Sequence, residues 1–110
     1  MYNETFLRLI AQPGFNSSEY LKAPGEGTND ADFAAWKNSA AVTQFCEDAS
    51  DANALLQSGE PLPDVGAGNL ACLFGCVFAY SVCLSGAGSG PEIIQCQMQE
   101  AVCIKNCNLQ

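Results

Sequence analysis

Apolar residues recur at helical spacing through the middle of the chain. They fall at intervals of three to five residues, with polar and acidic positions between them, at Phe33, Trp36, Ala40, Phe45, Ala49, Ala52 and Leu56. This period predicts one helix over about 31–57, capped by Asn29 or Asp30 and ended by Gly59. The acidic stretch near 48–51 is a point where that helix can break.

The C-terminal third of the chain contains two further helical segments. The first runs over about 69–84, carries no charged residue, and follows a linker at 59–68 whose two prolines forbid a continuous helix. The stretch SGAGSGP at 85–91 is too rich in glycine to be helical, and Pro91 suits the first turn of a last helix over about 91–106. Because the 69–84 segment is apolar on more than one side, it needs a cover besides its neighbour, which the 31–57 helix can supply.

Residues 1–28 differ from the rest of the chain in the pattern of their apolar residues. Small apolar groups alternate with Pro13-Gly14 and Pro24-Gly25, which predicts an extended arm rather than part of the helical domain at 29–110. Separated apolar groups suit docking into successive grooves of another protein. The candidate partner-binding residues are Phe6, Leu9, Ile10, Phe15 and Tyr20. The alternative is that the arm folds back on its own helices or stays disordered.

Six of the seven cysteines lie on the last two predicted helices, and their spacing is a palindrome. The gaps between them are 4, 7, 13, 7 and 4 residues, and the midpoint falls between Ser89 and Gly90 in the glycine-rich turn. In an antiparallel hairpin, facing residues have a constant sum of residue numbers, and at about 100° per residue each set of three cysteines falls on one stripe. The predicted disulfides are Cys72–Cys107, Cys76–Cys103 and Cys83–Cys96.

Other chemistry for these cysteines fits the sequence less well. A structural zinc site needs closely spaced ligands that often include histidine, and the chain has no histidine. A thioredoxin-like redox site needs a C-x-x-C motif, which is absent. The seventh cysteine, Cys46, precedes Glu47 and Asp48, whose negative charge disfavours a thiolate. We therefore expect Cys46 to be a small buried side chain, or else to form an intermolecular disulfide.

Composition narrows the class of protein. The 110 residues suit one domain, and a net charge of −8 argues against a nucleic-acid partner. The absence of histidine removes the commonest catalytic sets, so we expect no enzyme activity, no cofactor and no metal. The longest apolar run, 71–84, is shorter than the roughly 20 residues that span a membrane, which leaves only peripheral membrane contact open.

Seven cysteines indicate an oxidising compartment. The N-terminus lacks the pattern of a secretory signal. If Met1 is the native start, the mitochondrial intermembrane space is expected; otherwise the protein is secreted, periplasmic or in the thylakoid lumen.

The segments CLFGC at 72–76 and CIKNC at 103–107 resemble those of twin C-x3-C helical-hairpin proteins, which include small intermembrane-space chaperones, CHCH-like proteins and plant α-hairpinins. The resemblance covers about 36 residues and implies a stapled hairpin with outer-to-outer and inner-to-inner pairing. The third pair, Cys83 with Cys96, is additional to that pattern.

The expected fold is all-α, with a disulfide-stapled hairpin packed on the preceding helix. We expect a non-catalytic structural or accessory subunit, or an interaction protein, that docks on a larger assembly through its arm and apolar helices. The alternatives are a small secreted carrier of an apolar ligand and a secreted hairpin-type defence or effector protein.

Overall fold

The computed structural model describes residues 4–25, 27–59 and 70–108. Within these ranges the chain forms helices and connecting turns and contains no strand, which confirms the all-α prediction. Residues 60–68 of the predicted linker at 59–68 lie outside the described residues. The helices are α1 (Glu4–Ala11), α2 (Ser17–Tyr20), α3 (Asp30–Lys37), α4 (Ala40–Gln57), α5 (Leu70–Gly86) and α6 (Gly90–Asn108).

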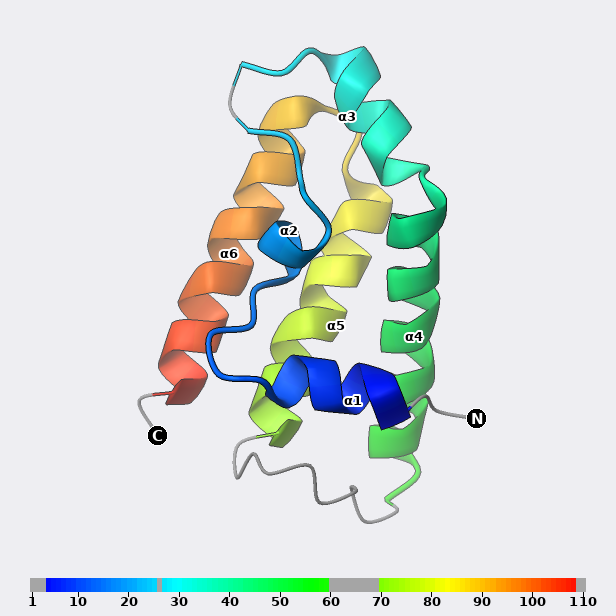
Figure 1. Cartoon of the computed structure of the whole chain (residues 1–110), viewed down its shortest axis with the longest axis vertical. Helices are drawn as coiled ribbons and strands as arrows, with labels where there is room; N and C mark the ends of the chain where they lie inside the picture. Colours follow the sequence, from blue (N-terminus) through cyan, green and yellow to red (C-terminus); the bar gives the residue numbers. More distant parts are fainter. Residues whose placement is uncertain (1–3, 26, 60–69, 109–110) are drawn as a thin grey trace.

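Helix α5 lies at the centre of the fold. It runs between α4 on one side and α6 on the other, while α1 crosses the ends of α4 and α5 and α2 lies against α6 (Figure 1). Contact with three helices explains why α5 carries no charge and buries apolar residues on several sides. The buried residues of α5 are Leu70, Leu73, Phe74, Cys76, Val77, Tyr80, Ser81 and Leu84.

The region expected to be one helix over 31–57 consists of two. The break falls at Asn38 and Ser39, because the side chain of Ser39 caps α4 by accepting a hydrogen bond from the backbone N–H of Val42 at 3.4 Å. The break considered near 48–51 does not occur. There, Ala49 and Ala52 are buried while the acidic residues lie toward solvent, so α4 continues without interruption.

The N-terminal segment corrects the prediction of an extended arm. Its apolar residues recur at helical spacing and form the inner face of α1. The segment therefore folds back on the chain's own helices, which was the alternative prediction, and it belongs to the core of the same domain. Phe6 meets Phe45 of α4 edge to face at 5.2 Å between ring centroids. Further along, Leu21 is buried and its carbonyl accepts a hydrogen bond from Trp36 Nε1 at 2.8 Å. The segment packs against the bundle because α5 has a second apolar side, which the segment covers.

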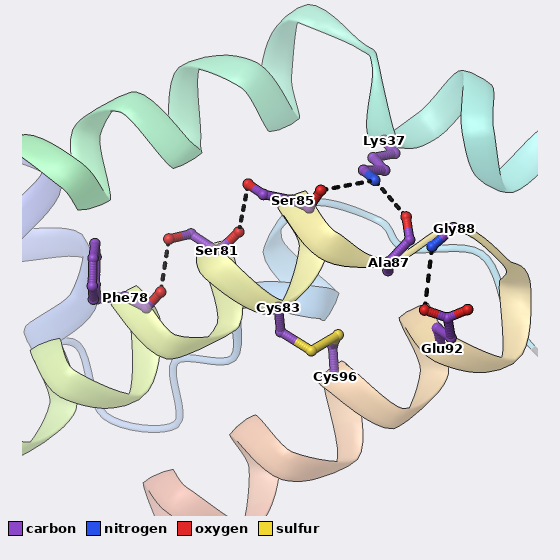
Figure 2. The surroundings of a disulfide bond; sticks show 9 residues. All are labelled: Lys37, Phe78, Ser81, Cys83, Ser85, Ala87, Gly88, Glu92 and Cys96. Atoms are coloured by element: carbon purple, nitrogen blue, oxygen red, sulfur yellow. Dashed lines mark hydrogen bonds between the residues drawn. A yellow bond between two sulfur atoms is a disulfide. The ribbon is translucent and has the colours of Figure 1, made fainter.

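Hydrogen bonds join the turn of the hairpin to α3. Lys37 Nζ donates hydrogen bonds to the carbonyls of Ser85 and Ala87 at the C-terminal end of α5 (Figure 2), where a positive charge suits the helix dipole. The N–H of Gly90 in turn donates to Asp30 Oδ1 at 3.0 Å. The turn is shorter than predicted, because α5 extends to Gly86 and α6 begins at Gly90.

Candidate functional site

Three disulfides join α5 to α6, with the predicted pairing. Their Cα–Cα distances are 5.8 Å for Cys72–Cys107, 5.7 Å for Cys76–Cys103 and 5.8 Å for Cys83–Cys96. The near-constant spacing shows that the two antiparallel helices keep the same separation at all three disulfides, which confirms the predicted ladder. Three intramolecular disulfides are typical of a protein in an oxidising compartment.

The sulfur atoms of the hairpin do not form a metal site. Those of Cys72, Cys76 and Cys107 lie within 4.8 Å of one another, which is close enough for shared ligation. All three are consumed in disulfides, however, and a metal needs thiolates. Their proximity follows from the adjacent rungs of the ladder.

The two sides of the hairpin differ in their cover. The N-terminal segment, α3 and α4 cover the hairpin elsewhere (Figure 1). On the uncovered side of α5, small side chains are exposed. A shallow groove of about 290 Å³ crosses this second side and is lined by residues of both helices, Val82 and Gln99 among them. We call this surface the open face. It consists of Ala71, Gly75, Ala79, Val82 and Gly86 of α5 and Gln95, Gln99 and Val102 of α6.

The open face is nearly free of charge although the chain carries a net charge of −8. Helix α5 contributes no charged residue, and Glu92 at the turn is the one acidic residue that lines the groove. Val82 and Val102 are 55% and 60% exposed, which is high for valines in a stapled, well-packed domain. An uncharged surface with exposed aliphatic side chains is suited to contact with another protein.

A buried polar cluster lies behind the open face, between α2, α5 and α6. The backbone N–H of Ser17 donates a hydrogen bond to Glu100 Oε1 at 2.8 Å, and Glu100 is 2% exposed. Burial raises the pKa of the Glu100 carboxyl, although the hydrogen bond from the N–H of Ser17 opposes this shift. Burial, and then the negative charge of Glu100, also raise the pKa of Tyr80 well above its usual value, so the phenol stays protonated.

Sequence reasoning missed this cluster. A signal was present, because Glu100 follows Cys96 by four residues and therefore lies beside the stapled stripe of α6. A carboxylate at this spacing lies near the seam of the hairpin, and the contact with α2 is what buries it.

The predicted partner-binding residues do not form one exposed surface. Phe6 and Ile10 are buried in the core, Leu9 and Phe15 are half-buried, and Tyr20 is exposed. A partner would reach Phe6 and Ile10 only if α1 left the bundle, so their expected contacts are corrected to contacts within the chain. Binding through Tyr20 stays a prediction.

Cys46 is a free, half-buried thiol on α4. It borders an open groove of about 430 Å³ that Lys37 and Leu84 also line. Burial raises the pKa of this thiol, and the opposing effect of Lys37 is smaller. Cys46 is therefore a poor nucleophile, and a disulfide to another chain stays a prediction.

The fold and the disulfide ladder define a disulfide-stapled all-α domain. Comparison with protein-family models, curated proteins and solved structures finds no significant match. The likeness to twin C-x3-C proteins therefore stays a likeness in staple pattern. Among the described helices, none combines the length and apolar character that crossing a membrane requires.

Proposed function

We propose that this chain is a non-catalytic structural or accessory protein that binds a protein partner through the open face of its stapled hairpin. The single observation that carries the proposal is the exposed, charge-free side of α5 in an acidic chain. The apolar helices thus take the docking role expected of them, and the N-terminal segment acts as their cover on the opposite side.

Rigidity supports this role. Three covalent links hold the open face in one shape, so a partner does not have to order it on binding. Small residues at 71, 75, 79 and 86 let the backbone of a partner come close to α5, while Val82 and Val102 supply apolar side chains for contact.

The proposed setting is an oxidising compartment. The intermembrane space, the periplasm, the thylakoid lumen and the extracellular space are each compatible with the disulfides. Fractionation of the native source, with non-reducing peptide mapping of the chain in each fraction, identifies the compartment.

Photo-crosslinking tests the docking proposal. A photoreactive amino acid at Val82 places the probe on the open face, and the same probe at Ala54 places it on an exposed position of α4. We expect a discrete adduct of defined mass from Val82 in the native source and none from Ala54. Adducts from both positions, or from neither, would refute docking through the open face.

A further inference from the structure

A small cavity opens on the open face between two of the disulfides. Its volume is about 50 Å³, and the half-cystines of Cys76–Cys103 and Cys83–Cys96 form its ends. Ala79 and Gln99 line it and are exposed, so the cavity reaches solvent between them, whereas Tyr80 and Glu100 line it and are buried. Since a single water needs roughly 10–15 Å³, the cavity holds only a few non-hydrogen atoms.

The buried residues of this cavity lack hydrogen-bond partners. Tyr80 OH and Glu100 Oε2 have none among the described residues, and both side chains are only 2% exposed. Two neighbouring atoms, Ser17 Oγ and Gln97 Nε2, are also without a hydrogen bond there. Buried polar atoms are almost always paired with protein, water or a bound group, so this cluster indicates a missing occupant.

Glu100 also lacks a charge partner. The chain has four basic residues, and each of them either makes another interaction or is exposed. Arg8 pairs with Glu4 at 2.9 Å, Lys37 binds the carbonyls of the turn, and Lys22 and Lys105 are exposed and form no ion pair in the described structure. A buried carboxylate without a cation is costly, and an arriving positive charge would offset that cost.

We propose that the cavity binds a primary ammonium group, supplied by a lysine side chain of the partner that docks on the open face. Glu100 Oε2 is the counter-ion, and the oxygen of Tyr80 accepts a second hydrogen bond. An ammonium on its neighbouring methylene matches the size of the cavity, and two of its three donors match these two buried acceptors. A divalent metal ion would need about six oxygen ligands, which these two side chains do not supply.

The surroundings of the cavity favour a lysine from a protein. Ala79 at the mouth is small, so the backbone of a partner can lie close enough for a lysine to reach inward. The adjacent groove along Val82 and Gln95 accommodates the residues that flank the lysine. The net charge of −8 attracts basic partners in general. This identification of the partner's chemistry rests on the proposed function, but the ammonium site itself does not.

Two-dimensional NMR of the oxidised protein, titrated with n-butylammonium chloride at constant ionic strength, tests the site. We expect saturable shifts of the amides of Ala79, Tyr80 and Glu100. Glu100→Gln keeps the size of the side chain and should weaken binding about 10- to 100-fold, as expected for a lost hydrogen bond to a charged group. Glu47→Gln is the matched control, because Glu47 is an exposed carboxylate on α4 that does not line this cavity or the adjacent groove, and it should leave the affinity unchanged.

Further arms of the experiment make the result decisive. Ala79→Leu narrows the mouth without touching Glu100 and should also abolish binding, which protects the test if Glu100→Gln perturbs the fold. Titration with 1-butanol should give no comparable shifts. Absence of saturable shifts with n-butylammonium, equal shifts with 1-butanol, or unchanged affinity in both Glu100→Gln and Ala79→Leu would overturn the proposal.

The crosslink from Val82 separates this inference from the proposed function. Loss of the adduct in Glu100→Gln but not in Glu47→Gln would support a lysine of the partner as the source of the ammonium. An adduct that persists in Glu100→Gln would refute the lysine and leave docking intact. If n-butylammonium binds but no adduct forms from Val82, the ammonium site is supported and the proposal of docking through the open face is refuted.

Discussion

The backbone N–H of Ser17 donates a hydrogen bond to the buried carboxylate of Glu100, 83 residues later in the chain. This bond joins the N-terminal segment to the last helix, α6, at a point that no described cation neutralises. It makes the packing of the segment sensitive to the charge of a single carboxyl group, since ionised Glu100 is disfavoured by burial.

The stability of the protein should therefore depend on pH through Glu100. Its pKa is raised in the folded state, so between the ordinary value of about 4.3 and the raised value the folded state binds more protons than the unfolded state. Ionised Glu100 thus destabilises the fold most at pH values above the raised pKa, and this unfavourable contribution is lost as pH falls from the raised pKa to the ordinary value. Denaturant unfolding from pH 4 to 8 should show this component in the native sequence and its loss in Glu100→Gln. The exposed residue Glu47 gives the control, Glu47→Gln, which should retain it.

Gly90 should tolerate no larger side chain. A Cβ atom at this position would lie 2.8 Å from Cδ2 of the buried ring of Phe33, so either α3 or the start of α6 has to shift. Gly90→Ala should cost about 1–3 kcal/mol in the free energy of unfolding. Gly88 lies in the same turn with open space around it, and Gly88→Ala should change the stability by less than about 0.5 kcal/mol. Equal effects of the two substitutions would contradict close packing of α3 on the turn.

Lys37 should stabilise the end of α5. Lys37→Met keeps much of the apolar stem but removes the hydrogen bonds to the carbonyls of Ser85 and Ala87, shown in Figure 2. We expect a loss of about 1–2 kcal/mol in thermal or denaturant unfolding. Lys22→Met, at an exposed position, is the control and should have little effect. If both variants unfold alike, Lys37 is not a cap of α5.

Reduction of the disulfides should release α6 before the other long helices. Helix α6 buries one large aliphatic residue, Ile93, besides its half-cystines, whereas α5 buries a broad apolar surface. In the loop-closure model each disulfide contributes about 3 kcal/mol, although nested loops do not add fully. Hydrogen exchange with and without reductant should show loss of protection in α6 while α4 keeps its own.

The free thiol requires a control in the reduction experiment. Cys46→Ser removes thiol exchange from α4 and leaves the three disulfides, so it should show the same order of events. Unchanged protection of α6 in the reduced protein would show that packing alone holds the hairpin together.

The hairpin could be predicted because its information is local and redundant. The palindromic spacing of the cysteines, the helical period and the glycine-rich turn each indicate the same antiparallel pair, and the disulfides follow from helix geometry alone. The break at Ser39 also had a local signal, the capping side chain, but the apolar period on both sides of it concealed the change of helix.

The place of the N-terminal segment and the character of the open face were decided by tertiary structure. The pattern at Phe6 and Ile10 predicts an apolar helical face. Such a face can be buried against the chain's own α4 and α5 or against another protein, and the pattern does not distinguish the two. Likewise, the position of Glu100 beside the stapled stripe predicts which way it points, but its burial depends on α2 arriving to cover it. The sequence by itself determined the elements and their covalent links, since these depend on neighbours along the helix. Only packing between distant segments decided which apolar side was covered and which remained open.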